Sequence, residues 1–156
     1  MPMVYTVALA TEANIATSGT PNTETEVFFV KPGVRNAALQ AMYVIGKGAG
    51  LTAISGIVFR LIRWGTAATA GVSITPVPKD PGMQAAKQTA ASAPTAGTTR
   101  LNHVLFGCGA AGPGGWVAPN PDSVIMLEGG GAQSIDALAA SGTASLNFEF
   151  SAETVE

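Results

Sequence analysis

The sequence predicts an all-β fold built from antiparallel strands. Runs rich in β-branched and aromatic residues recur about every ten residues and are separated by Gly, Pro, Asn and Ser. The last run, residues 146–150, alternates apolar and polar side chains, as a half-buried antiparallel strand does. Charged residues make up only 12% of the 156 residues, against about 25% in a typical chain. These observations together favour one sandwich or barrel domain over residues 1–156.

The strand signal recurs along the whole chain, and each run ends at a turn signal. The expected strands are residues 4–10, 24–31, 37–45, 54–64, 72–77, 98–106, 115–118, 123–127 and 144–150. Pro32 and Gly33 end the second run, and a glycine-rich segment, 46–50, ends the third.

Two segments carry a helical signal instead. Residues 80–90 begin with an acidic N-cap and Pro81 at the first helical position, so they predict one short helix on a long loop. Residues 135–140 give a weaker signal for a helical turn.

The N-terminal segment has little charge, and residues 17–21 separate it from the strand that begins at Glu24. We therefore expect residues 1–21 to form an extended arm that adds to the sheet of a neighbour. On this interpretation, deletion of residues 1–14 leaves the fold intact and weakens docking.

The run 54–64 is apolar on both faces. Alternation places Arg63 on the face of Phe59 and Leu61, and Arg60 on the other face. Either the chain covers this strand twice, or its outer face contacts another subunit, and we favour the second. The candidate interface comprises Val58, Arg60, Ile62, Trp64, Val4, Tyr5 and Trp116. A buried arginine needs a partner, so we expect Arg60 and Arg63 each to pair with a carboxylate, either across the sheet or across a subunit boundary; a ligand-binding arginine is the alternative.

Composition argues against several functional classes. Eight Lys and Arg against ten Asp and Glu leave no basic patch for nucleic acid. One cysteine cannot form an intrachain disulfide. The longest uncharged run, 101–121, is too rich in Gly and Pro to be a membrane helix. No Lys or Arg precedes Lys31, so we expect no secretory signal, and a chain made and used without export.

The motifs with catalytic or ligand-binding potential have simpler structural explanations. Residues 107–112 match G-x-G-x-x-G, but Pro113 follows where a dinucleotide fold needs a helix, so we expect a loop. His103 and Cys108 lack a third group for nucleophilic catalysis and further ligands for zinc.

The carboxylates give no better case for a site. Glu24 and Glu26 fit a solvated strand start, and Asp122, Glu128 and Asp136 lack the alternate spacing of a calcium loop. We expect no catalytic residue, no cofactor and no metal, and hence no enzyme.

Residues 59–81 (FRLIRWGTAATAGVSITPVPKDP) resemble the small jelly-roll structural proteins of tailed bacteriophage virions. In those proteins an apolar strand with arginines leads into a Gly/Thr/Ala hairpin, a Thr-Pro-x-Pro segment and an Asp-Pro turn. The segment 116–119 and the closing strand fit the same plan. The sequence departs from it at Gly82 and Met83, where a second acidic turn is expected, and the N-terminal third matches only in pattern.

The resemblance implies an antiparallel jelly roll of about eight strands that decorates, or cements, a bacteriophage capsid. It implies a homotrimer on the capsid surface, bound between major capsid proteins and assembled in the host cytoplasm. The alternative is a carbohydrate- or receptor-binding head or tail-fibre module. That alternative predicts an exposed aromatic cluster drawn from Tyr5, Tyr43, Trp64 and Trp116. A hydrolase, the remaining rival, would need a G-x-S-x-G or paired-acid motif, and neither is present.

Overall fold

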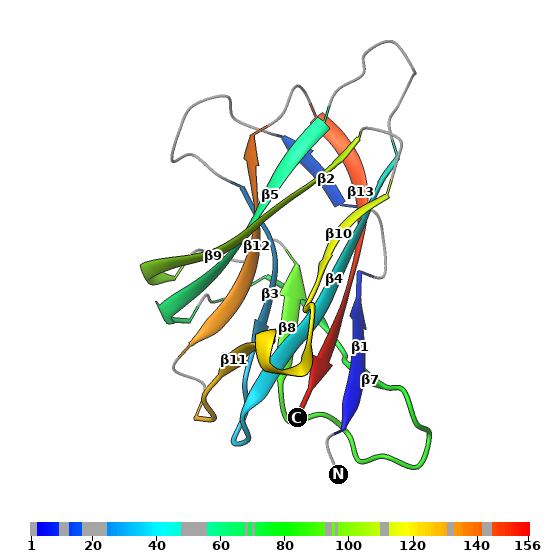
Figure 1. The fold of residues 1–156 in the computed structure, drawn as a ribbon, viewed down its shortest axis with the longest axis vertical. Coiled ribbons are helices and arrows are strands. Elements are labelled where there is room, and N and C mark those ends of the chain that lie inside the picture. Colours follow the sequence, from blue (N-terminus) through cyan, green and yellow to red (C-terminus); the bar gives the residue numbers. More distant parts are fainter. Residues whose placement is uncertain are drawn as a thin grey trace.

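The computed structural model is an antiparallel β-sandwich, as the sequence predicts (Figure 1). It describes residues 3–9, 13–16, 25–47, 56–67, 69, 71–92, 95, 97–109, 113–130, 133–141 and 145–156. Sheet A contains, in order, β10 (Pro113–Val117), β4 (Ala37–Lys47), β13 (Ser145–Val155), β1 (Val4–Ala8) and β7 (Val77–Pro78), with β11 (Ile125–Leu127) also on β4 and β2 (Ala13–Ala16) also on β13. Sheet B contains, in order, β6 (Val72–Ile74), β8 (Thr89–Ser92), β3 (Thr25–Lys31), β12 (Ser134–Ser141), β5 (Gly56–Thr66) and β9 (Thr98–Gly109).

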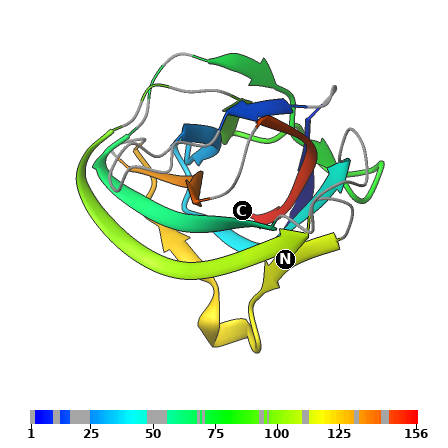
Figure 2. The same cartoon turned by 90° about the horizontal axis from the view of Figure 1, so that it is seen from above.

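The strand pairing is that of a jelly roll. The main strands pair from the outside of the sequence inward: β1 with β13, β3 with β12, β4 with β10 and β11, and β5 with β9, all antiparallel. A long hairpin rolled into two sheets produces this nested order. Figure 2 shows the innermost pair, β5 and β9, as two parallel arcs that curve around one side of the sandwich.

The connection between β5 and β9 extends both sheets. Within it, β8 pairs with β3 and β6 pairs with β8, while β7 pairs with β1. Sheet A thereby gains β7 beside β1. Sheet B gains β8 beside β3, and β6 beside β8.

The core lies between the two sheets and is centred on three aromatic rings. Phe59 of β5 meets Phe148 and Phe150 of β13 edge to face, with ring centroids 5.4 and 5.1 Å apart. Edge-to-face contacts suit the charge distribution of aromatic rings and add to the free energy of burial. The neighbouring buried side chains of this core include Phe28, Leu39, Met42, Leu61, Leu127 and Ile135.

Strand β13 confirms the alternation expected for its first half. Phe148 and Phe150 are buried, and Glu149 between them is exposed. On β4 the alternation shifts by one residue, because Ala41 and Leu39 pair with the consecutive residues Glu153 and Thr154. This bulge lets both Leu39 and Met42 enter the core.

The helix expected over residues 80–90 does not form. Turns occupy 79–83, and the segment then enters β8 at Thr89, with Ala90 and Ala91 buried in sheet B. A helix this short is marginal in water, whereas pairing with β3 satisfies its backbone groups. Over the residues that the structure describes, the one helical element is the 3-10 turn η1 (Pro121–Ser123), which Asn120 caps.

The helical turn expected over residues 135–140 is also wrong. These residues lie in β12, which pairs with β3 on one side and β5 on the other. Ala and Asp are poor strand formers, but two neighbouring strands override that preference.

The first strand belongs to the sandwich and not to an arm. β1 pairs with β13 over five residues and with β7 on its other side, and Tyr5 and Val7 are fully buried. Residues 17–21 of the expected arm lie outside the described residues.

Candidate interaction surfaces

The outer face of sheet A carries exposed apolar side chains. After the bulge in β4, Met42 and Val44 point to the core, so Tyr43 and Ile45 point outward, with 41% and 48% of their surface exposed. Val117 of β10, which is 54% exposed, pairs with Ala41 in the same outward row. The surface defined by Tyr43, Ile45 and Val117 is called the sheet A outer face below.

Polar groups border this face without dividing it. Glu149 and Ser151 pair with Ile45 and Tyr43 across β13. Glu153 forms an ion pair with Lys79 at the far side. On the other side Gly115 pairs with Tyr43, and a Cβ there would lie 2.5 Å from the carbonyl oxygen of Met42.

Three of the predicted interface residues are buried inside the chain. Tyr5 lies in the core side of sheet A, and Ile62 and Trp64 form a small second cluster with Phe29 and Ala91 on sheet B. A Cβ on Gly97 would lie 2.7 Å from the Cβ of Trp64, so this segment covers the indole. Strand β5, which is apolar on both faces, is thus covered by its own chain at Ile62 and Trp64. This finding corrects our preference for a subunit contact at these residues.

The other predicted interface residues do not share one surface. Val4 alternates with the buried Tyr5 and lies on the outward side of sheet A. Val58 is exposed and Arg60 half-buried on sheet B, whereas Trp116 pairs with the buried Met42 and points toward the space between the sheets.

The carboxylate of Asp136, which the sequence analysis weighed only as a calcium ligand, lies beside Trp64. Asp136 is fully buried in β12; its Oδ2 accepts a hydrogen bond of 2.9 Å from Trp64 Nε1, and its Oδ1 accepts one of 2.7 Å from Ser134 Oγ. The register that pairs Asp136 with Ile62 in adjacent strands creates this contact. Trp64 and Asp136 are 72 positions apart in the sequence, so local patterns do not reveal it.

Arg63 does not pair with a carboxylate in the described part of the chain. Its Nη1 donates a long hydrogen bond of 3.5 Å to the carbonyl oxygen of Met126, and its Nε is buried without a partner. The ion pair expected across the sheet is therefore not formed by this arginine among the described residues, and a pair across a subunit boundary stays a prediction.

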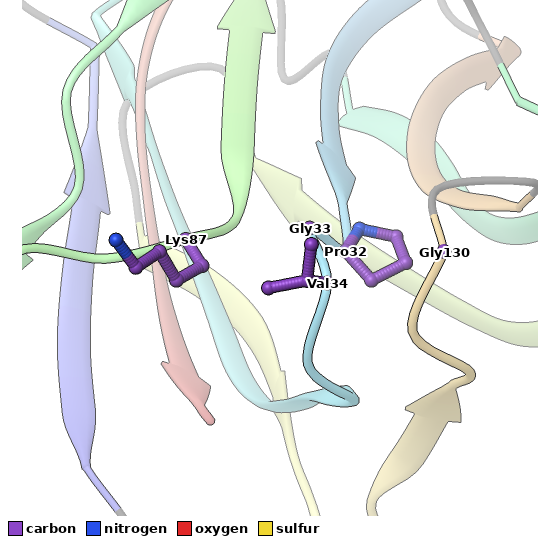
Figure 3. A pocket seen from close by; sticks show the side chains of 5 residues that line it. All are labelled: Pro32, Gly33, Val34, Lys87 and Gly130. Carbon is purple, nitrogen blue, oxygen red and sulfur yellow. The ribbon is translucent and has the colours of Figure 1, made fainter.

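A shallow pocket opens at the turn between β3 and β4 (Figure 3). Its volume is about 250 Å³, and Pro32, Gly33, Val34, Lys87 and Gly130 line it. A Cβ on Gly33 would lie 2.1 Å from the carbonyl oxygen of Lys87, so only glycine fits there. Lys87 is the one titratable side chain in this lining, which gives the pocket no acid–base pair for a reaction.

The remaining motifs are accounted for by strands, turns or undescribed residues. Residues 107–109 end β9 and Pro113 begins β10, so no helix follows the glycine motif. His103 and Cys108 lie on β9, Glu26 lies on β3, and Glu24 is outside the described residues. Asp122 lies in η1 and Glu128 directly after β11. Among the described residues, no three His, Cys, Asp or Glu side chains could hold a metal ion together.

No helix in the described part of the chain is long and apolar enough to cross a membrane.

No family model and no curated protein matches this chain. The solved structures similar to it include three from infectious bursal disease virus: the Gx strain, the VP2 subviral particle and the virus-derived T=1 particles. Their sequences are 9%, 10% and 10% identical to this chain, with TM-scores of 0.25, 0.25 and 0.24. Each alignment covers 99% of this chain and 42%, 41% and 40% of the viral chains, so this chain spans about two fifths of their length. The jelly-roll assignment rests on the strand pairing described above.

Proposed function

We propose that this chain is a virion structural protein that decorates and stabilises a bacteriophage capsid. In this role a homotrimer binds between major capsid proteins at the capsid surface, after assembly in the host cytoplasm. The observation that carries the proposal is the sheet A outer face, where Tyr43, Ile45 and Val117 are exposed on adjacent strands. The nested jelly-roll pairing and the resemblance of residues 59–81 to phage structural proteins support it.

Exposed apolar groups on a sheet face favour contact with another protein. Burying such surface contributes about 25 cal/mol per Å² of apolar area, and tyrosine is among the residues enriched at the centre of interfaces. Neighbouring Gly115 and Ser151 are small, so a partner surface can approach the backbone on both sides of Tyr43.

The proposed mechanism is mechanical. A sandwich whose first and last strands pair with each other resists being pulled open from its ends, because β1 and β13 share a ladder of five residue pairs. Each contact with the capsid contributes little alone, but a trimer bridging several capsid subunits multiplies the effective affinity. No chemical step and no cofactor is required.

Imaging of the particles tests this proposal. Capsids assembled with and without the chain should differ by a discrete layer of density between major capsid proteins. Particles that lack the chain should also release their genome at lower temperature. Identical density in the two preparations would overturn the decoration role.

The trimer is tested separately by sedimentation of the purified chain. We expect a species of three times the monomer mass at micromolar concentration. A monomer both in solution and on the capsid would contradict the trimer while leaving capsid binding intact.

The alternative, a carbohydrate- or receptor-binding module, requires an exposed aromatic cluster. Tyr5 and Trp64 are buried, and Tyr43 and Trp116 point to opposite sides of sheet A. Among the described residues these four side chains therefore form no such cluster, and this alternative ranks second.

A further inference from the structure

Arg63 occupies an unusual position at the open side of the sandwich. On β5 it follows Phe59 and Leu61 on the side that faces the core. Beyond the core its guanidinium reaches sheet A, where Nη1 donates to the carbonyl oxygen of Met126 on β11 at 3.5 Å. That distance is at the outer limit of a hydrogen bond, so among the described residues most of the donor capacity of this arginine has no protein acceptor.

The guanidinium lines a pocket of about 390 Å³ between β5, β11 and the η1 turn. This volume falls within the range of about 300–1,000 Å³ that is typical of small-molecule sites. The other lining residues are Trp116, Pro119, Asp122, Ser123, Val124, Ile125 and Met126. One wall is therefore apolar, and two charged groups of opposite sign complete the lining.

The two charged groups do not neutralise each other. Arg63 forms no ion pair with Asp122, and the Asp122 carboxylate has no hydrogen-bond partner in the described chain. Arg63 Nε is buried and unpartnered. A buried donor without a partner costs free energy in the folded state, and such atoms are few in native proteins. Arg63 Nε itself is out of reach of a ligand, so a group in the pocket would accept hydrogen bonds from the Nη groups of this guanidinium instead.

The pocket walls are held in place before any ligand binds. Asn120 Oδ1 accepts hydrogen bonds from the Asp122 backbone N–H at 3.0 Å and from Ser123 Oγ at 2.9 Å, which fixes the η1 turn. Trp116 is half-buried and packs against the main core. Little conformational entropy is therefore lost when a ligand enters.

We propose that this pocket binds a neutral hexose unit of a glycan. An anionic ligand would face the Asp122 carboxylate, and a cationic one would face the Arg63 guanidinium. A hydroxyl group both donates and accepts, so adjacent hydroxyls of one sugar satisfy Asp122 and Arg63 together. The carbon face of the ring packs on Trp116 and Pro119, which supply the apolar wall.

This site differs from the exposed aromatic platform of the alternative function, because it uses a single tryptophan and a pair of opposite charges. It also lies apart from the sheet A outer face: Trp116 points to the inner side of β10, whereas Val117 points outward. Capsid binding and sugar binding are therefore separable properties.

Saturation-transfer NMR on the purified full chain tests the site. The probes are D-glucose, D-galactose, D-mannose and N-acetyl-D-glucosamine, with acetate and methylammonium as charged probes. We expect saturable binding of at least one sugar, and none of acetate or methylammonium. D122N removes a charged acceptor without changing shape, and should weaken that binding about tenfold or more.

The matched control is E128Q, which makes the same charge change at an exposed carboxylate that does not line the pocket. It should bind like the wild type, and thermal unfolding should show that both variants fold. R63K keeps the positive charge but loses the planar donors of arginine, and it should also weaken binding. Absence of saturable binding for all four sugars, equal affinity of wild type and D122N, or binding of a charged probe instead would each overturn the proposal.

Discussion

Asp136 contributes to stability through a buried polar network. It accepts hydrogen bonds from Trp64 and Ser134, and all three side chains are buried. D136A leaves the Trp64 N–H without this acceptor, so we expect it to lower the free energy of unfolding by about 3 kcal/mol or more. S134A removes one hydroxyl donor and should cost about 1 kcal/mol. Urea unfolding followed by tryptophan fluorescence measures both; equal losses in the two variants would refute the central role of the carboxylate.

Tyr5 makes stability sensitive to alkaline pH. Burial raises the pKa of its phenol, the Glu156 carboxylate raises it further, and Arg35 opposes both. The folded state therefore keeps the phenolic proton at a pH where the unfolded chain releases it. The resulting stability is present below about pH 10, the ordinary pKa of tyrosine, and is lost as the pH rises toward the raised pKa of the folded state.

Y5F removes this titration, so its free energy of unfolding should fall less steeply above pH 10 than that of the wild type. At neutral pH it should cost about 0.5–1.5 kcal/mol, because the hydroxyl donates to the carbonyl oxygen of Gln84 at 3.1 Å. Y43F, at an exposed tyrosine, is the control and should behave like the wild type. Parallel pH profiles of Y5F and wild type would show that another group causes the alkaline loss.

At the scale of elements, the turn after β3 depends on a close backbone approach. A Cβ on Gly33 would lie 2.1 Å from the Lys87 carbonyl oxygen, whereas the nearest atom to a Cβ on Gly82 is 3.5 Å away. We expect G33A to lower the melting temperature by several degrees, since about 1 kcal/mol shifts a small domain by a few degrees. G82A should leave it nearly unchanged. Equal melting temperatures for the two variants would contradict this geometry.

The first strand is expected to be essential for folding. β1 lies between β13 and β7 and contributes two fully buried side chains, Tyr5 and Val7. Deletion of residues 1–8 should therefore abolish cooperative unfolding, contrary to what the sequence predicts for the N-terminal segment. Circular dichroism during heating measures this. A truncated chain that melts in one sharp transition would restore the arm interpretation.

The sequence predicts strands where turn residues separate apolar runs, and fails where pairing partners decide. The sequence predicts strands at 24–31, 37–45 and 54–64, because Gly and Pro end them or hydrophobic residues dominate them, and the structure has β3, β4 and β5 there. β12 and β8 are rich in Ala and Ser, and they become strands because β3 and its neighbours pair with them. Local propensity has no access to those long-range hydrogen bonds.

At the scale of the whole molecule, the sequence indicates that both faces of β5 are covered. It does not identify whether the same chain or another subunit covers them. The cover over Trp64 comes from the segment at Gly97, which the insertion between β5 and β9 brings back. Tyr43 and Ile45 were missed as surface residues because Met42 and Val44 beside them are equally apolar. When both faces of a strand are apolar, alternation does not distinguish a core side from a contact side.

The central claim, docking through the sheet A outer face, is tested most directly by the occupancy of a variant on capsids. Y43K places a charge at the centre of this face, and V72K places the same charge on an exposed valine of β6 in the other sheet. Co-sedimentation with capsids that lack the chain should show Y43K weakened by about thirtyfold or more, the effect of losing about 2 kcal/mol at an interface centre. V72K should bind at wild-type occupancy. Wild-type occupancy of a folded Y43K, or equal losses for the two variants, would contradict the claim.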